Sequence, residues 1–202
     1  MLTVGKDDGR VERLLSEGRL ACPACGARLR GWGRSRPRVI RGEGGIGWRL
    51  RPRRTRCAGC RRTHVLLPAW VLARRADAVR VIGAALAAAA AGLGHRPIAE
   101  RLGRPAATVR GWLRRFASRA EALRAGFTAL ACALDPDPLL PGPAGSPAAD
   151  AVAAIVAAAA AAVRRWGNVL ALSAWELAAA VSSARLLAPG EAQMVLNANC
   201  PW

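Results

Sequence analysis

Two short cysteine pairs, Cys22-Pro-Ala-Cys25 and Cys57-Ala-Gly-Cys60, are the residues whose types and spacing most clearly predict chemistry. Each pair presents two thiolates from one tight turn, and four thiolates complete the tetrahedral shell that zinc prefers. In a reducing compartment such pairs are more often metal ligands than disulfides. We therefore predict one structural zinc ion per chain, held by Cys22, Cys25, Cys57 and Cys60, with an iron–sulfur cluster or a redox pair as the alternatives.

The interval between Cys25 and Cys57 is 31 residues, longer than the roughly 15 to 20 that are usual between such pairs. Doubling a loop costs only about 0.6 kcal/mol, whereas a structural zinc ion contributes an apparent stabilisation of about 10 to 16 kcal/mol. The long interval is therefore tolerable and predicts extra strand and turn between the pairs. Candidate strands of this zinc ribbon are residues 28–32, 38–41, 48–51 and 63–67.

Glycine and histidine residues near the pairs have expected supporting roles. Gly26 and Gly59 suit the tight turns. His64 is the nearest alternative ligand, but four sulfurs already close the shell. Cys132 and Cys200 lack partners at metal spacing, so they are expected to be small buried hydrophobic residues.

Downstream of Pro68, apolar residues at helical spacing predict three further helical segments. The first covers residues 69–91 as one or two helices, and Gly92 and Gly94 end it. A short helix opened by Pro97 stops at Gly103. The third helix is expected to run from beside Pro105 to about residue 125.

The segment 98–112, Ile-Ala-Glu-Arg-Leu-Gly-Arg-Pro-Ala-Ala-Thr-Val-Arg-Gly-Trp, resembles the helix-turn-helix family. Small Ala99 lets two helices cross closely, and Gly103 permits the tight turn. Val109 and Trp112 would pack the third helix against its supports. Arg104 departs from the resemblance, since that position is commonly apolar, and Pro105 stands where a serine cap is common.

The solvent face of the third helix is small at its leading end and basic behind, which suits insertion into a major groove. The resemblance implies that leading residues approach base edges and that Arg110 or Arg114 contacts guanine. It also implies phosphate contacts from Arg101, Arg104, Thr108 and Arg119. The alternative is a solvated basic face on a packing module. The expected DNA-contacting residues are Arg101, Arg104, Ala106, Ala107, Thr108, Arg110, Arg114, Arg115 and Arg119.

The net charge of +18 is spread unevenly along the chain. Residues 1–75 carry 19 basic and 5 acidic residues, residues 76–127 carry 9 and 3, and residues 128–202 carry 3 and 5. A surface for a polyanion is therefore expected in the first two thirds. Codon bias in a GC-rich genome would account for part of the arginine content, but not for the low number of basic residues in the last third.

The sequence of residues 128–202, the tail, predicts a proline-rich linker followed by helices. Ser146, with Pro147 and Asp150, predicts a helix start, and Ser173 with Glu176 predicts a capping box. Pro189-Gly190 is expected to end the second helix. The pair of helices would pack on the DNA-binding part or on a partner chain through the bulky side chains of Trp166, Trp175 and Trp202. The alternative is that the pair forms a small self-contained hairpin.

The expected fold is mostly α with a small β zinc ribbon. Its parts are an N-terminal helix (1–19), a four-cysteine zinc ribbon (20–68), a three-helix helix-turn-helix domain (69–127), a proline-rich linker (128–147) and a C-terminal helical hairpin (148–202).

Several classes of function are disfavoured by the sequence. The chain has no tyrosine, which excludes a tyrosine recombinase, and neither histidine stands with a serine-activating constellation. A carboxylate triad is not expected, because the tail has no strand pattern to hold its acidic residues together; these are Asp135, Asp137, Asp150, Glu176 and Glu191. We therefore expect no enzyme and no small-molecule substrate.

The first 20 residues do not resemble a signal peptide, and the apolar runs 81–93 and 151–163 are 13 residues each, short of the roughly 20 needed to cross a bilayer. We therefore expect no membrane association and a cytoplasmic, nucleoid-associated protein.

The whole arrangement, over residues 8–127 and including a short leading helix around 11–17, resembles bacterial, chiefly actinobacterial, proteins that combine a zinc ribbon with a helix-turn-helix. It is also similar to the N-terminal DNA-binding halves of insertion-sequence transposases. The resemblance implies a sequence-preferring, double-stranded-DNA-binding protein in transposition or transcription regulation, with a homodimer or a transposase as possible partners. The alternatives are an adaptor for a transposase or polymerase subunit and a non-catalytic transposase remnant.

Overall fold

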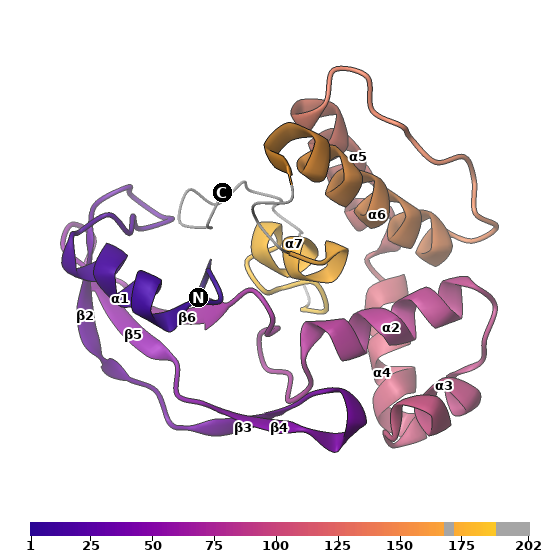
Figure 1. Ribbon diagram of the computed structural model, residues 1–202, viewed down its shortest axis with the longest axis horizontal. Coiled ribbons are helices and arrows are strands. Elements are labelled where there is room, and N and C mark those ends of the chain that lie inside the picture. The colour runs from indigo at the N-terminus through magenta and orange to yellow at the C-terminus, as the bar shows by residue number, and fades with distance from the viewer. Residues whose placement is uncertain (168–171, 189–202) are drawn as a thin grey trace.

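The computed structural model describes residues 1–167 and 172–188, and this part of the chain contains six β-strands and seven α-helices. The strands gather at one end of the molecule and helices α2 to α7 at the other (Figure 1). The predicted helix end at Pro189-Gly190, together with Glu191, Cys200 and Trp202, lies outside the described residues.

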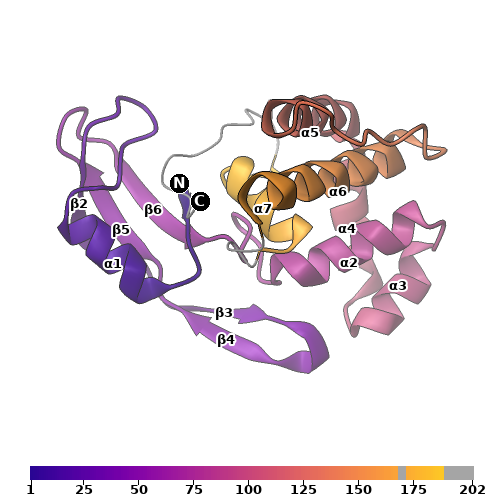
Figure 2. The same ribbon diagram turned by 45° about the horizontal axis from the view of Figure 1, so that its top comes forward.

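A four-stranded sheet has the order β1-β6-β5-β2. Its strands are β1 (Leu2–Val4), β2 (Leu29–Arg34), β5 (Arg53–Cys57) and β6 (Thr63–Pro68). β1 runs parallel to β6, and the other pairs are antiparallel. Helix α1 (Asp8–Ser16) crosses one face of this sheet (Figure 2) and buries Val11 and Leu15 in a small core that also contains Cys22 and Cys57.

A second, two-stranded sheet projects from the first toward the helices (Figure 2). It is the hairpin of β3 (Arg38–Arg41) and β4 (Gly47–Leu50), with a short 3₁₀ turn at Glu43–Gly45. The four predicted strands are thus present, three of them shifted by one or two residues. β1 and β5 were not predicted, because β1 has only three residues and β5 reads Arg-Arg-Thr-Arg-Cys, which has little apolar alternation.

Helices α2 (Val79–Ala90), α3 (His95–Leu102) and α4 (Ala106–Ala117) pack around one apolar cluster. The cluster takes Ile82 from α2, Ile98 from α3 and Trp112 from α4. Residues 103–105 connect α3 to α4, and Gly103 has the left-handed φ of 61° that the tight turn requires.

Two predicted helix boundaries were wrong. Residues 69–78 are not helical: Val71 bonds back to Pro68 and pairs with Ala78, so α2 begins only at Val79. The third predicted helix is divided at Ser118 and Arg119, and α5 (Ala120–Leu134) follows. The break lets the Arg119 side chain reach the carbonyls of Arg185 and Ala188, a tertiary contact that a helical period does not reveal.

The tail begins later than predicted and joins the main core. α5 continues to Leu134, past the expected linker start at 128, and α6 (Pro147–Trp166) lies beside it in both views (Figures 1 and 2). α7 (Ala174–Val181) contacts α6, α2 and β1. One apolar cluster therefore extends from Ile40 to Leu187, and the tail helices do not form a separate hairpin.

Both predicted helix starts in the tail are confirmed. The Ser146 side chain accepts a hydrogen bond from the Ala149 N–H, and Pro147 opens α6. At α7 the Ser173 hydroxyl accepts from the Glu176 N–H, while the Glu176 carboxylate accepts from the Ser173 N–H.

Helix α6 is, among the described helices, the one with the length and apolar composition of a membrane span. Half of its span is buried inside the protein, as in a core helix. Its 20 residues exceed the 13-residue run that the sequence suggested, because the flanking residues Pro147–Asp150 and Arg164–Trp166 are helical as well.

Replacing Gly83 with alanine is expected to destabilise the protein by about 1 to 3 kcal/mol, the usual cost of overpacking a filled core. A Cβ at this position would lie 2.2 Å from Cγ of Trp175, so α7 must move away from α2. Gly142→Ala is the matched control, since no atom lies within 4 Å of its added Cβ. Thermal unfolding of both variants measures the difference, and equal melting temperatures would contradict the packing of Trp175 on Gly83.

Candidate functional site

The four predicted metal ligands meet in one place. Their sulfur atoms lie within 4.8 Å of one another, with Sγ of Cys22 3.7 Å from that of Cys60 and Sγ of Cys25 3.4 Å from that of Cys57. Tetrahedral ligands about 2.3 Å from a shared metal lie about 3.8 Å apart. The cluster therefore has the size of a four-sulfur site and can hold a metal ion.

The two cysteine turns are built alike. The N–H of Cys22 donates to the carbonyl of Ala27 over 2.8 Å, and the N–H of Cys57 donates to the carbonyl of Arg62 over 2.9 Å. The residue after each second cysteine has a left-handed φ, 71° at Gly26 and 64° at Arg61. The predicted role of Gly26 fits this backbone, but the corresponding residue of the second turn is Arg61.

Gly59 serves a different purpose from the one predicted. Its φ is not left-handed, but a Cβ there would lie 3.0 Å from Cβ of Ala27 and 3.6 Å from Sγ of Cys25. Glycine at this position therefore lets the two turns approach each other closely enough for their sulfurs to meet.

Hydrogen bonds and burial at the cluster shift the pKa values of Cys25 and Cys60 in opposite directions. A hydrogen bond from the backbone of Ala27, aided by the neighbouring Cys57 and Cys60, lowers the pKa of Cys25 to about 6. A backbone bond from Arg62 lowers the pKa of Cys60, but burial and the neighbouring thiols outweigh it and raise the pKa to about 11. Four negative sulfurs at these distances repel one another unless a cation lies between them.

His64 lies beside the sulfur cluster, with Nε2 3.4 Å from Sγ of Cys22. Burial, followed by the positive N-terminus and Arg62, lowers its pKa, so the ring is neutral near pH 7. A neutral imidazole at this distance can donate one hydrogen bond to a metal-bound thiolate and orient it.

The remaining described cysteine, Cys132, corrects a sequence expectation. It is exposed on α5 rather than buried. The apolar residues of α5 that face the core occupy other positions of the helix, among them Leu130, Ala131 and Leu134.

Helix α4 presents the second predicted group of residues. Val109, Trp112 and Phe116 are buried, whereas Arg110 and Arg114 are exposed on the opposite side. Within the described residues, neither Arg110 nor Arg114 forms an ion pair. Their charge is therefore available to an anion outside the chain.

The other predicted contact residues on α3 and α4 have varied exposure. Ala107 and Arg101 are exposed, while Ala106 and Thr108 are half-buried. The Arg115 guanidinium donates to the Gly111 carbonyl over 2.9 Å, which turns it back along its own helix. Arg96 was not predicted as a contact residue, but it is exposed at the start of α3 and has no ion-pair partner among the described residues. The sequence signal that could have identified it is its position directly before Pro97, where the helix was expected to begin.

Two predicted phosphate contacts, Arg104 and Arg119, are directed into the protein. The side chain of Arg104 is 6% exposed; its Nε lies 2.6 Å from Oδ1 of Asp77, and its Nη2 lies 2.6 Å from the carbonyl of Gly42. Arg119 is buried and donates to two carbonyls beyond α7. The expectation that these two arginines hold phosphates does not fit their burial.

The Arg104–Asp77 pair fixes the β3–β4 hairpin to the helices. Asp77 also accepts from Arg41 of β3 over 2.7 Å, so one buried carboxylate joins the hairpin to the turn before α4. The sequence signal was already present, because Arg104 was the residue that departed from the apolar pattern of the turn.

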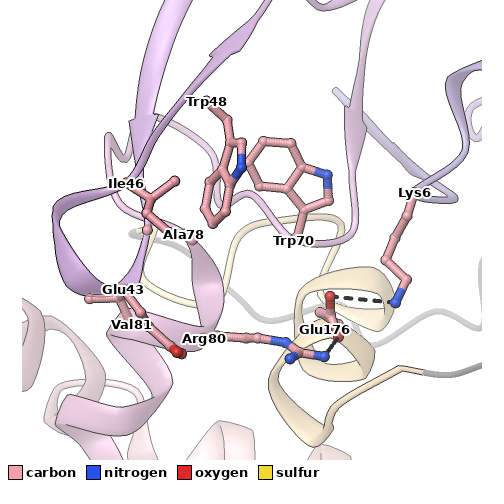
Figure 3. A pocket seen from close by; sticks show the side chains of 10 residues that line it. Lys6, Glu43, Ile46, Trp48, Trp70, Ala78, Arg80, Val81 and Glu176 are labelled. Carbon is pink, nitrogen blue, oxygen red and sulfur yellow. Dashed lines mark hydrogen bonds and ion pairs between the residues drawn. The ribbon is translucent and has the colours of Figure 1, made fainter.

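A cavity of about 540 Å³ opens where the hairpin faces α2 and α7 (Figure 3). The rings of Trp48 and Trp70 meet edge to face in its wall, with centroids 5.7 Å apart. Glu176 lies at its other side, where its carboxylate accepts from Arg80 over 3.1 Å and pairs with Lys6 over 3.8 Å. The cavity was not predicted because its walls come from segments more than 100 residues apart.

Residues 22–112 match the model of a protein family described as a domain of unknown function, DUF6431. The matched region begins at Cys22, the first cysteine of the cluster, includes both cysteine turns and the β3–β4 hairpin, and ends within α4. No curated protein and no solved structure matches the chain. The similarity thus covers the cysteine cluster and the first part of α4, including Arg110 but not Arg114.

Proposed function

We propose that this chain is a sequence-preferring, double-stranded-DNA-binding protein in which α3 and α4 form a helix-turn-helix and α4 enters the major groove. The observation that supports this most directly is the solvent face of α4. It carries small residues at its start and, behind them, Arg110 and Arg114, which pair with no carboxylate of the described residues.

The dimensions and chemistry of α4 suit that role. A helix about 10 to 12 Å across fits a major groove about 12 Å wide. Ala106 and Ala107 allow the leading turn to approach base edges, and an arginine one or two turns later has the reach and paired donors to contact guanine O6 and N7. Arg101, in the last turn of α3, and Thr108, in the first turn of α4, would contact phosphates.

In this proposal the metal is zinc, and the four-stranded sheet with its two cysteine turns is a zinc ribbon. Zinc has no redox chemistry and accepts four thiolates in a closed tetrahedral shell, which agrees with the sulfur separations. Its role is structural: it stabilises the basic four-stranded sheet. The β3–β4 hairpin that projects from this sheet is held to the helices by Arg104, which bonds to Gly42 and Asp77. A role in transposition or transcription regulation follows from the sequence resemblance.

Replacing Arg114 with alanine is expected to weaken binding to a preferred duplex by about 1 to 3 kcal/mol and to relax the preference at one base pair. Binding to random duplex should weaken much less, because phosphate contacts carry most of that affinity. Fluorescence anisotropy on both duplexes, with the preferred site taken from a selected pool, measures the two losses.

Arg165→Ala is the matched control, since it removes the same charge from the exposed end of α6, where Arg165 forms no ion pair with a described residue. The two variants have the same net charge, so a general electrostatic effect would be equal in both. Equal losses for the two variants, on preferred and random duplex alike, would contradict base reading by Arg114.

A further inference from the structure

The face of the four-stranded sheet opposite α1 carries an exposed tryptophan among arginines. Arg30 of β2 lies directly across from Arg56 of β5. Arg54, two residues before Arg56 in β5, points to the same face. The adjacent partners Leu29 and Cys57 belong to the core under α1, so they point to the other face. We call the surface formed by Arg30, Trp32, Arg54 and Arg56 the tryptophan–arginine face.

Trp32 is held in a defined position although it is 51% exposed. The guanidinium carbon of Arg56 lies 4.8 Å from the centroid of its ring, a cation–π contact. Nε of Arg56 also donates to the carbonyl of Arg61 over 3.4 Å, which limits the movement of the guanidinium. One side of the indole is therefore supported by the protein, while half of the side chain remains available to a partner.

The backbone of β2 directs Trp32 to this face. The pairing of β2 with β5 shifts between Gly31 and Arg34, so one extra residue is inserted at Trp32 and Gly33. Gly33 has a φ of 79°, a conformation that favours glycine. Bulges of this kind change the direction of a side chain on an edge strand, and β2 is the edge of the sheet.

The arginines on the two faces of the sheet differ in whether they pair with a carboxylate. On the α1 side, Glu12 pairs with Arg34 at 3.0 Å and with Arg53 at 3.3 Å. Across residues 1–167 and 172–188, no carboxylate forms an ion pair with an arginine of the tryptophan–arginine face. A cationic surface with a presented indole is thus complementary to a partner that offers both negative charge and flat rings.

A comparison with Trp48, which is also exposed, supports a specific role for Trp32. Trp48 packs against Trp70 and over Gly42, where an added Cβ would lie 2.3 Å from its ring. It therefore contributes to the wall between the hairpin and the helices. Trp32 has no such aromatic partner among the described residues, and Arg56 lies over its ring.

We propose that the tryptophan–arginine face binds single-stranded DNA, with an unpaired base stacked on Trp32 and the neighbouring arginines on its phosphates. Stacking of a base on an aromatic side chain needs an open base face, which a continuous duplex does not offer. The arginines track the backbone without reading sequence. This site is separate from α4, so it does not depend on the proposed duplex reading.

The experiment measures binding of a fluorescein-labelled oligothymidylate to the full-length, metal-loaded protein by anisotropy. Trp32→Ala is expected to weaken binding about 5- to 150-fold, the loss of one stacked base, and to leave random-duplex binding within about twofold. Trp32→Phe should retain most of the affinity, because it keeps an aromatic face. Val39→Ala, a truncation of another exposed apolar residue on β3, should change neither.

Three results would overturn the proposal: wild-type affinity for oligothymidylate in Trp32→Ala, equal losses in Trp32→Ala and Val39→Ala, or an equal loss on duplex and single strand. Arg114→Ala separates this inference from the proposed function. A protein that binds oligothymidylate through Trp32 but shows no duplex preference would support the single-strand site and contradict reading by α4.

Discussion

Replacing Cys25 with alanine is expected to abolish the fold of the four-stranded sheet and to release the metal. The core under this sheet is small, and two of its nine buried members are the predicted ligands Cys22 and Cys57. A structural zinc ion contributes an apparent stabilisation of about 10 to 16 kcal/mol, more than the whole stability of most domains. A core of this size should not persist without it.

The measurement combines elemental analysis of metal per chain with near-ultraviolet circular dichroism of the tryptophan side chains. Chelation of the wild-type protein should give the same result as Cys25→Ala, whereas the helices, which have their own large core, should keep most of their far-ultraviolet signal. Cys132→Ala is the control, because it removes an exposed thiol on α5 that lies outside the sulfur cluster. Full metal content and an unchanged melting temperature in Cys25→Ala would contradict the four-sulfur site.

Replacing Asp77 with alanine is expected to destabilise the protein by about 3 to 5 kcal/mol, the usual cost of removing one partner of a buried ion pair. The Asp77 side chain is 3% exposed and accepts from both Arg104 and Arg41. Its loss leaves the Arg104 guanidinium buried without a counter-ion, and the hydrogen bond from Arg104 to the Gly42 carbonyl is then the remaining side-chain link from Arg104 to the hairpin among the described residues. Urea denaturation monitored by circular dichroism gives the change in free energy of unfolding.

Glu121→Gln serves as the control for Asp77→Ala, since Glu121 pairs with Arg124 at the exposed surface of α5. Exposed pairs of this kind contribute about 0 to 1 kcal/mol. A loss at Asp77 no larger than the loss at Glu121 would show that the Arg104–Asp77 contact does not hold the hairpin in place.

The parts of the structure that were predictable from sequence are those governed by neighbours in the chain. The cysteine spacing predicted that four sulfurs would lie together, and the capping residues Ser146 and Ser173 predicted where α6 and α7 begin. The apolar period and Gly103 gave α3, the turn and the start of α4. In each case the decisive interaction spans only a few residues or is made by a metal ligand with strict geometry.

The parts that were not predictable depend on contacts between distant residues. Arg104 and Arg119 look like surface arginines in the sequence, and only the positions of Asp77, Gly42 and the carbonyls of Arg185 and Ala188 show that they are buried. The parallel pairing of β1 with β6 joins residues about 64 positions apart. The tail helices read equally well as a separate hairpin, because the packing of α6 on α5 leaves no local sign.

The division of the arginines into two groups refines the functional proposal. Arg41, Arg104 and Arg119 stabilise the fold, whereas Arg110 and Arg114 on α4 and Arg30, Arg54 and Arg56 on the sheet have no acidic partner among the described residues. Net charge alone does not make this distinction. The second group is where contact with nucleic acid is expected.

Selection of duplexes from a random pool by the full-length, metal-loaded protein tests duplex reading by α4 most directly. The predicted result is enrichment of a motif of a few base pairs, lost when Arg110 and Arg114 are both replaced by alanine and retained in Arg165→Ala. A pool that stays random after repeated selection, from a preparation with full metal content and a cooperative unfolding transition, would contradict duplex reading by α4 and would favour the protein-adaptor alternative.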